Sequence, residues 1–190
     1  MSPIEREIQQ CLKTLNNGGT ILYPTDTIWG IGCDATDFAA VDKVYLLKRK
    51  KEHKSLIVLL DEPEKIREFV TVVPEIAWDL LNNVDTPLTI IYPDAKNLAP
   101  NVIAADQSVA IRIVRNEFCK RMISAFGKPL VSTSANISGD PPPRVFKNIS
   151  TEIINGVDYV VDESLDLLQQ VKPSRIIKLN LNGEFRIIRH

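Results

Sequence analysis

The sequence predicts an α/β fold, with a twisted mixed sheet flanked by helices. Two observations carry this prediction. Segments with helical and strand-like patterns alternate along the first part of the chain. The chain also closes on Asn182-Gly183 between two apolar runs, a pattern typical of a hairpin. The 190 residues, 44% of them hydrophobic, favour one domain with its own core over two. We therefore expect a single domain over residues 1–190.

Each element of the first half has a local signature. Apolar residues recur at helical spacing from Ile4 to Leu15, and Gly18-Gly19 ends that helix. A second helix over 37–48 has an expected inner face of Phe38, Val41, Val44, Tyr45 and Leu47. We further expect strands at 20–23 and 56–60, a helix opened by Asp61 and Pro63, and a helix at 75–81.

The second half continues with more strands. We expect strands at 88–92, 109–114 and 159–161, and a helix at 117–126 closed by Gly127. A short strand at 130–131 leads into a polar segment, and 138–143 is a loop rich in Pro and Gly. The runs 175–181 and 184–189 form the terminal hairpin.

The composition excludes several classes. Lys plus Arg is 23 and Asp plus Glu is 24, so no global charge attracts nucleic acid or acidic lipid. Three scattered cysteines and two histidines suggest neither a disulfide framework nor a metal cluster. The N-terminus lacks the apolar core of a signal peptide, and no apolar run is long enough to span a membrane. These features predict a cytoplasmic protein.

Polar residues follow two of the expected strands directly, where ligands of α/β proteins gather. Thr25, Asp26 and Thr27 come after the first strand, and Ser132-Thr-Ser-Ala-Asn136 comes after a later one. Each segment taken alone also fits a turn in which side chains bond their own backbone. Arg112 is a single cation on the strand that follows Ser108, and alone it fits an edge charge or half of an ion pair.

Cations gather in one segment, Lys48-Arg-Lys-Lys51, with Lys54 close behind. Alone it fits a solvated helix end, where cations suit the helix dipole. A triphosphate site would use several of them. Millimolar to micromolar affinity requires ~4 to 8 kcal/mol, and charge-assisted hydrogen bonds contribute ~1.5 to 3 kcal/mol each.

Gly30-Ile-Gly-Cys-Asp-Ala35 matches the G-x-G-x-x-A pattern of dinucleotide-binding proteins. Six residues separate it from the preceding strand, whereas the pattern requires the strand to run straight into the glycines. A nicotinamide-dependent oxidoreductase would rest on this match alone. No phosphate-binding loop with a Gly-Lys-Ser/Thr ending and no Ser-His-Asp set is present in the sequence.

Taken together and in order, the segments resemble the YrdC-like family, in particular its threonylcarbamoyl-AMP synthases. The segments are Pro24 to Gly32, Lys48 to Lys50, the strand Leu56 to Leu59, Pro87-Leu-Thr89, Val109 to Arg112 and Ser134-Ala-Asn-Ile-Ser-Gly139. The resemblance runs from about Gly18 to the C-terminus. It implies a large concave basic cavity in a twisted sheet, and the short, single-domain form of the family.

The resemblance also implies a reaction. L-threonine, bicarbonate or CO2, and ATP with Mg2+ would give threonylcarbamoyl-AMP and pyrophosphate, with no metal held tightly by the protein. A tRNA threonylcarbamoyl-transferase complex would then use the product to modify adenosine in tRNA. Some family members have affinity for RNA, so the competing hypothesis is a non-catalytic RNA-binding module that uses the same concave basic surface.

By the same resemblance, site residues can be assigned by number. The catalytic signature falls on Lys48, Lys50, Ser134 and Asn136. Threonine contacts fall on Thr25, Arg112, Ser132 and Ser174. Nucleotide contacts fall on Lys48, Arg49, Lys50, Ser108, Ser134, Asn136 and Arg189.

This sequence departs from the family pattern at three places. Lys50 stands where the family has arginine, so either Lys50 acts as a point charge or Arg49 reaches the phosphates instead. Pro142 replaces a serine that often contacts ATP. Pro173-Ser-Arg175 replaces the usual Glu-Ser-Thr around Ser174.

Overall fold

The computed structural model describes residues 1–50, 56–166 and 173–189. In this part of the chain, nine strands form one mixed sheet in the order β7-β1-β2-β6-β3-β5-β4-β8-β9. The strands are β1 (Ile21–Tyr23), β2 (Gly30–Asp34), β3 (Ile57–Leu60), β4 (Leu88–Tyr92), β5 (Val109–Ile113), β6 (Leu130–Ser134), β7 (Tyr159–Val160), β8 (Arg175–Leu179) and β9 (Phe185–Arg189). The pairs β1–β7, β3–β5 and β4–β8 are parallel, and the other five pairs are antiparallel.

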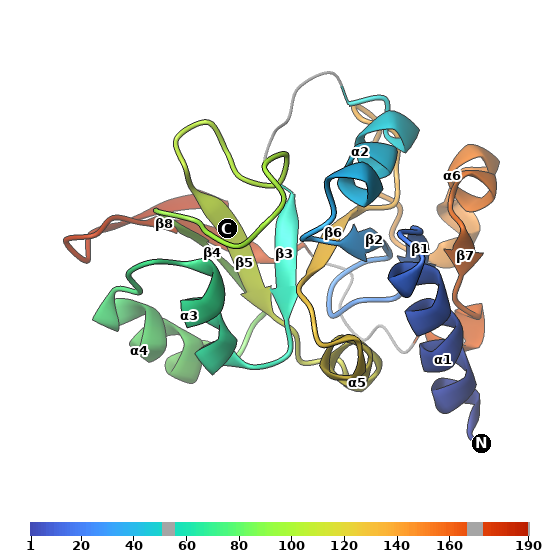
Figure 1. Ribbon diagram of the computed structural model, residues 1–190, viewed down its shortest axis with the longest axis horizontal. Helices are drawn as coiled ribbons and strands as arrows, with labels where there is room; N and C mark the ends of the chain where they lie inside the picture. The colour runs from blue at the N-terminus through green and yellow to red at the C-terminus, as the bar shows by residue number, and fades with distance from the viewer. Residues whose placement is uncertain (51–55, 167–172, 190) are drawn as a thin grey trace.

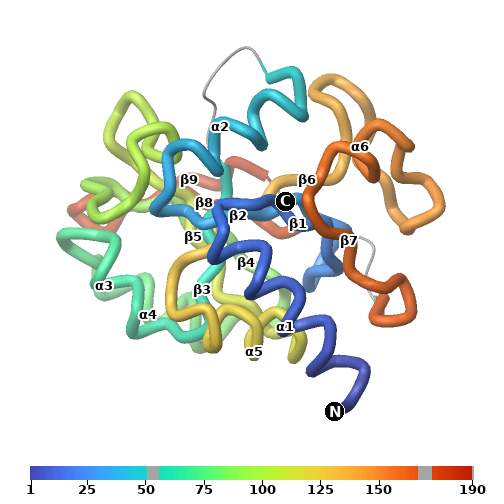
Figure 2. Tube along the Cα trace, turned by 45° about the vertical axis from the view of Figure 1, so that its right-hand side comes forward, coloured from blue at the N-terminus to red at the C-terminus, as the bar shows by residue number. Residues whose placement is uncertain are grey.

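Six α-helices surround the sheet. They are α1 (Pro3–Asn16), α2 (Phe38–Leu47), α3 (Ile66–Phe69), α4 (Glu75–Asn83), α5 (Glu117–Phe126) and α6 (Thr151–Gly156) in the described residues. In both views, α2 lies on one side of the central strands and α5 on the other (Figure 1, Figure 2). The helices α3 and α4 share the side of α5 (Figure 1), and α1 packs against α5.

Helix ends follow local rules. Ser2 and Glu5 form a reciprocal capping box at the start of α1. The side chain of Asn116 accepts the backbone N–H of Cys119 to cap α5, and Gly127 ends that helix in the left-handed conformation. Gly183 has a positive φ in the turn between β8 and β9, as the Asn-Gly pattern predicts.

Most expected elements are confirmed within a residue or two, among them α1, α5, β4 and the terminal hairpin. Several expectations are wrong. Residues 30–34 form strand β2, which the sequence reading did not predict. Strand β6 continues through the polar residues to Ser134, because Ser132–Ser134 pair with β2. Phe38 was placed on the inner face of α2, but it is 55% exposed, and Ala40 is buried instead.

The helix expected after Asp61 is short and irregular. A 3-10 turn at Pro63–Lys65 precedes the four-residue α3. Asp61 does not cap it, because the carboxylate pairs with Lys65 instead, with Oδ2 2.8 Å from Nζ. The structure also adds α6, which the sequence reading did not include.

The core lies on both faces of the central strands and joins residues from most of the described elements. Cys11, Cys33 and Cys119 are all buried as free thiols. No helix in the described part of the chain is both long and apolar enough to cross a membrane.

Candidate active site

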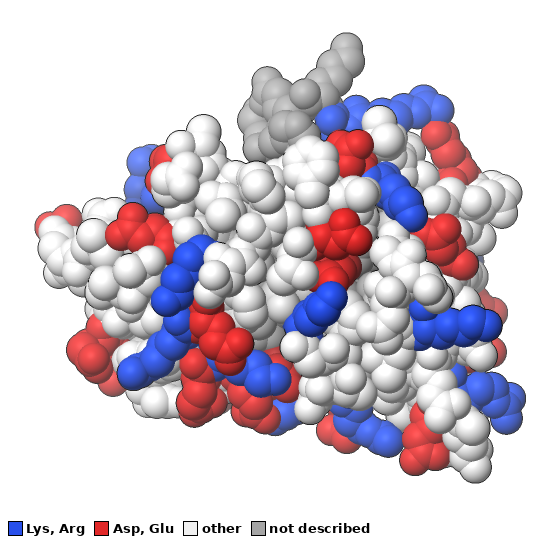
Figure 3. Space-filling model, in the orientation of Figure 1, with Lys and Arg blue, Asp and Glu red and all other residues white. Residues whose placement is uncertain are grey.

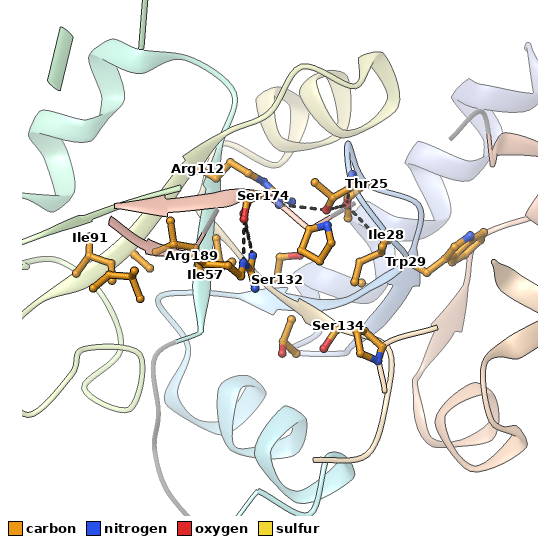
Figure 4. Close-up of a pocket in the computed structure, with 18 residues that line it drawn as sticks. Thr25, Ile28, Trp29, Ile57, Ile91, Arg112, Ser132, Ser134, Ser174 and Arg189 are labelled. Atoms are coloured by element: carbon orange, nitrogen blue, oxygen red, sulfur yellow. Dashed lines mark hydrogen bonds between the residues drawn. The ribbon is translucent and has the colours of Figure 1, made fainter. Parts of the chain in front are cut away.

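A cavity of about 290 Å³ opens on one face of the sheet (Figure 4). Its walls come from the loop between β1 and β2, from β5 and β6, and from the segment around β8 and β9. Hydroxyl groups and two guanidinium groups supply its polar lining: Thr25, Thr27, Ser132, Thr133, Ser134, Ser174, Arg112 and Arg189. Many small donors beside two cations suit a small anionic ligand with several polar groups.

Arg112 lies on β5, and only 4% of its side chain is exposed. Its Nη1 donates to the hydroxyl of Thr27 at 3.2 Å. Its Nε lies 3.9 Å from Oδ2 of Asp26. A buried guanidinium is costly unless charge and hydrogen bonds compensate it. Arg112 is therefore held mainly by the loop between β1 and β2, with the guanidinium directed toward the cavity (Figure 4).

Thr25 is anchored within the same loop. Its hydroxyl donates to the carbonyl oxygen of Ile28 at 2.7 Å and lies 3.2 Å from the hydroxyl of Thr27. The backbone N–H of Thr27 donates to the Thr25 hydroxyl. A turn in which side chains bond their own backbone is thus present, but Thr25 forms it, and Asp26 bonds the distant backbone of Arg115 instead. The turn holds the hydroxyls of Thr25 and Thr27 at the cavity wall.

Arg189 and Ser174 meet across the hairpin. Nε and Nη2 of Arg189 donate to the carbonyl oxygen of Ser174 at 2.9 and 2.8 Å. Nη2 also lies 3.3 Å from the Ser174 hydroxyl, which in turn lies 2.8 Å from the hydroxyl of Thr89. A register shift in the β8–β9 pair places Arg189 opposite Ile176, so Ile188 and Arg189 both face the cavity.

The charge of Arg112 acts on Arg189. Burial lowers the pKa of Arg189, and the positive charge of Arg112 lowers it further. Two like charges converge on one cavity, and no Asp or Glu is among the described residues that line it. This electrostatic arrangement favours an anion in the cavity.

Lys48 is placed differently from the expectation of a solvated helix end. It is only 3% exposed, and its ammonium donates to the carbonyl oxygens of Ser134 and Asn136 at 2.5 and 2.6 Å. Burial lowers the pKa of Lys48 to about 8, with a smaller contribution from the charge of Lys50. Lys48 thus joins the end of α2 to the segment that follows β6, beside the cavity rather than in its wall.

The neighbours of Lys48 lie farther out. Arg49 is 68% exposed and pairs with Glu152 on α6 at 2.6 Å. The ammonium of Lys50 lies 5.6 Å from the ring centre of Tyr45. Neither residue lines the cavity. Lys51, Lys54 and the internal histidine, His53, lie outside the described residues.

Ser108 and Asn136 also stand outside the cavity wall. The Ser108 hydroxyl donates to Asp106 at 2.6 Å, and the same carboxylate binds Lys178. The side-chain amide of Asn136 donates to the carbonyl oxygens of Ile137 and Asp140, at 2.8 Å each. Asn136 therefore shapes the loop that carries Pro142, which does line the cavity.

Of the assigned residues, the fold brings six together at the cavity: Thr25, Arg112, Ser132, Ser134, Ser174 and Arg189. Sequence reasoning gave no role to Thr89, whose hydroxyl supports Ser174. The sequence did carry a signal, since Thr89 is a polar residue within the apolar run 88–92, and the structure shows that it is fully buried. Sequence reasoning also did not predict that the Asp26 side chain points away from the cavity and lies between Arg112 and the start of α5.

The glycine pattern has a packing explanation. Gly30 and Gly32 lie within β2 and not in a turn between a strand and a helix. A Cβ at Gly32 would lie 2.7 Å from the Tyr23 ring and 2.8 Å from the Val131 carbonyl oxygen. The residues Gly30 to Ala35 thus do not form a pyrophosphate-binding turn, which removes the basis for the oxidoreductase hypothesis.

The residues at the cavity do not fit a protein-held metal ion. Magnesium prefers carboxylate and water oxygens in octahedral geometry, and the described lining residues supply no carboxylate. In the part of the chain that the structure describes, no three His, Cys, Asp or Glu residues gather in a metal-binding arrangement.

Comparison with known proteins shows which family this chain resembles. The family model Sua5/YciO/YrdC, described as "Telomere recombination", matches residues 13–190. A curated protein named threonylcarbamoyl-AMP synthase from Hahella chejuensis is 34% identical over 170 residues, covering 89% of this chain and 91% of that protein. One of the same name from Marinobacter nauticus is 30% identical over 187 residues and covers 97% of both chains.

Solved structures share the fold. E. coli YciO has a TM-score of 0.81 at 21% identity, covering 97% of this chain and 89% of its own. P. abyssi Sua5 complexed with L-threonine has a TM-score of 0.79 at 24% identity, covering 90% of this chain. This chain spans about half of that longer protein, because the match covers 50% of it.

Proposed function

The chain belongs to the Sua5/YciO/YrdC family, and from this premise we propose that it is a threonylcarbamoyl-AMP synthase. The enzyme forms an adenylate and is classed as a nucleotidyltransferase. The observation that carries the proposal is the convergence of Arg112 and Arg189 on one hydroxyl-lined cavity. Two relatives named threonylcarbamoyl-AMP synthase are 34% and 30% identical to this chain over 89% and 97% of its length.

The reaction needs no covalent intermediate with the protein. The amine of L-threonine bonds to the carbon of CO2, supplied by bicarbonate with loss of water, and releases a proton. An oxygen of the resulting carbamate attacks the α-phosphorus of ATP. The bond from that phosphorus to the bridging oxygen breaks, and pyrophosphate leaves. The protein's contribution is to align the two anions and offset their charge.

The amino-acid end of the site is assigned to Thr25, Arg112, Ser132 and Ser174. The guanidinium of Arg112 offers a planar pair of donors to the threonine carboxylate. The cavity of about 290 Å³ has room for about ten water-sized groups. That space holds an amino acid and the reacting part of a nucleotide, and the rest of ATP extends beyond it.

The nucleotide end is assigned to Ser134, Asn136, Lys48, Ser108 and Arg189. Arg189 lies against Ser174, so the phosphates and the amino acid meet at that point. Two of the three ammonium N–H bonds of Lys48 hold carbonyl oxygens, and the third is assigned to phosphate.

The second cation of the signature is assigned to Lys50, with Arg49 as the alternative. Arg49 is engaged with Glu152 and would have to leave that ion pair to reach a phosphate. The ammonium of Lys50 lies over the Tyr45 ring, two residues after Lys48 in the chain, which supports it as the point charge of the pair.

Mg2+ enters as part of the substrate, coordinated by the phosphates of ATP, which suits its preference for phosphate and water oxygens. It assists the protein cations in offsetting the phosphate charge.

In this proposal the product is the substrate of a tRNA threonylcarbamoyl-transferase complex. Because that complex modifies tRNA, we expect the protein to act in the cytoplasm. Residues 1–190 act as one YrdC-like domain. Affinity for RNA is a separate expectation of the family. On the face drawn in Figure 3, cations and anions are intermingled, with no broad basic region among the residues described.

A direct test is isothermal titration with L-threonine and with ATP, each in the absence of bicarbonate. Both ligands should bind at one site per chain. The Arg112→Ala variant should lose the ability to bind L-threonine and should still bind ATP. Loss of ATP binding with intact threonine binding in that variant would contradict the assignment of the two ends.

A further inference from the structure

Asp26 lies in the loop between β1 and β2, and its side chain is 93% buried, with 7% exposed. Thr25 and Thr27 on either side line the cavity, whereas Asp26 does not. Its carboxylate turns instead toward the end of β5 and the start of α5. Oδ1 accepts the backbone N–H groups of Arg115, at 2.8 Å, and of Asn116.

The other oxygen of Asp26 faces Arg112. Oδ2 lies 3.9 Å from Nε of Arg112, and both atoms are buried without a hydrogen-bond partner in the described part of the chain. A buried unpaired donor facing a buried unpaired acceptor is costly unless each serves the other through charge. Asp26 is the counter-ion of Arg112, and in the described residues no other carboxylate forms an ion pair with it.

The contact between Asp26 and Arg112 joins parts of the sheet that are not neighbours. The loop that carries Asp26 joins β1 to β2, and strands β6 and β3 lie between β2 and β5, so this loop reaches past two strands to meet Arg112. The Thr27 hydroxyl reaches Arg112 from the same loop. One carboxylate therefore joins two parts of the cavity wall that the sheet does not hold together directly.

We propose that Asp26 is a positioning residue, which holds the Arg112 guanidinium in the orientation that binds the substrate carboxylate. The proposal rests on the proposed function for the identity of that carboxylate. Asp26 does not touch the substrate. It acts through Arg112, by holding the Nε atom of the guanidinium, which Oδ2 of Asp26 faces.

The orientation role and a simple charge role predict opposite results for Asp26→Asn. The amide keeps an oxygen for the N–H groups of Arg115 and Asn116, but it removes the negative charge. If Asp26 only reduced the positive charge of the cavity, its loss would strengthen binding of an anion. If it positions Arg112, its loss weakens that binding.

The experiment compares the wild type with Asp26→Asn and with a matched control, Asp34→Asn. Asp34 is also a buried carboxylate, it pairs with Lys128 at 2.6 Å, and it accepts the backbone N–H of Thr36. It does not line the cavity. Thermal unfolding of all three proteins checks that each is folded.

The first readout is the Nε–H resonance of Arg112 in ligand-free protein, assigned by its loss in Arg112→Lys. We expect the chemical shift of this resonance to change, or its line to broaden, in Asp26→Asn, and both to remain as in the wild type in Asp34→Asn. The second readout is kinetic. For Asp26→Asn, KM for L-threonine should rise about tenfold, while kcat and ATP affinity change by less than about threefold, as for loss of ground-state binding. Asp26→Glu, which keeps the charge, should recover part of the affinity.

An unmoved resonance in Asp26→Asn, or threonine binding that is unchanged or tighter, would overturn the proposal. Equal losses in Asp26→Asn and Asp34→Asn would also overturn it, because they indicate general destabilisation. If the wild type itself bound no threonine, the proposed function would fail. The resonance in ligand-free protein would still decide whether Asp26 orients Arg112.

Discussion

Lys48 is a cation almost entirely removed from water, with its ammonium against two backbone carbonyl oxygens. Its pKa of about 8 lies below the ordinary value of 10.5 because burial disfavours the charged form. Such a residue does two things at once. It fixes the segment after β6, and it keeps a positive charge close to the cavity at neutral pH.

This depressed pKa makes stability depend on pH. Between about pH 8 and 10.5 the unfolded chain keeps the proton on Lys48 and the folded chain has lost it, so stability rises with pH in this window. Relative to Lys48→Met, the wild type should gain about 2 kcal/mol of unfolding free energy between pH 7 and pH 9.5. Urea unfolding at the two pH values measures this. Parallel pH dependence in the two proteins would contradict the burial of a charged Lys48.

The same residue carries a catalytic prediction. In Lys48→Met, turnover should fall by at least about a hundredfold, because a phosphate contact made in the transition state and the placement of Ser134 are both lost. Lys13 on α1 is an exposed control, and Lys13→Met should leave turnover unchanged. Turnover that falls only in step with thermal stability would make Lys48 purely structural.

At the scale of elements, strand β2 explains two glycines that resemble a nucleotide-binding motif. Gly32 lies where a Cβ would contact the Tyr23 ring and the Val131 carbonyl oxygen below 3.0 Å. At Gly30, a Cβ would lie 3.0 Å from the Ser132 hydroxyl and 3.2 Å from the Thr25 methyl group, both in the cavity wall. One strand therefore serves sheet packing at one position and substrate access at another.

This difference predicts two separable phenotypes. Gly32→Ala should cost about 2 to 4 kcal/mol of stability, as overpacking of a closed site does. Gly30→Ala should change stability less and raise KM for L-threonine, because the added methyl group narrows the cavity beside Ser132. Thermal unfolding and steady-state kinetics of both variants measure this. If Gly30→Ala and Gly32→Ala lost equal stability and had the same KM for L-threonine, the two glycines would not have the separate roles described.

Local patterns in the sequence were enough for most elements, since the helix end at Gly127 and the hairpin turn at Asn182-Gly183 are decided by neighbouring residues. Strand β2 was missed because Gly30 and Gly32 weaken any strand pattern, and only pairing with β1 and β6 forms the strand. The end of β6 was missed because pairing with β2, and not its own residue pattern, forms it. Its polar residues are strand residues because β2 lies beside them.

At the scale of the whole molecule, the cavity joins residues from Thr25 to Arg189, nearly the full length of the chain. Periodicity cannot bring such distant residues together, because no local rule relates them. The family resemblance assigned residues to one site by their order, and the fold brings six of them to the cavity wall. The assigned residues Lys48, Lys50, Ser108 and Asn136 do not line the cavity.

Ligand binding should stabilise the whole fold, because one cavity joins strands from across the sheet. At about 100 times its Kd, a ligand adds about 2.7 kcal/mol to the free energy of unfolding. L-threonine and ATP without bicarbonate should each raise Tm by several degrees, and both together should raise it further. A short tRNA fragment that raises Tm while L-threonine does not would instead favour the RNA-binding module.

The central claim is that this protein uses the cavity to form an adenylate from threonine. The most direct measurement is release of pyrophosphate from ATP by the purified protein, with the nucleotide product identified by mass spectrometry. Release should require both L-threonine and bicarbonate, the product should be threonylcarbamoyl-AMP, and Arg112→Ala should abolish it. Pyrophosphate release that is independent of threonine, or ATP binding with no adenylate formed, would contradict the account.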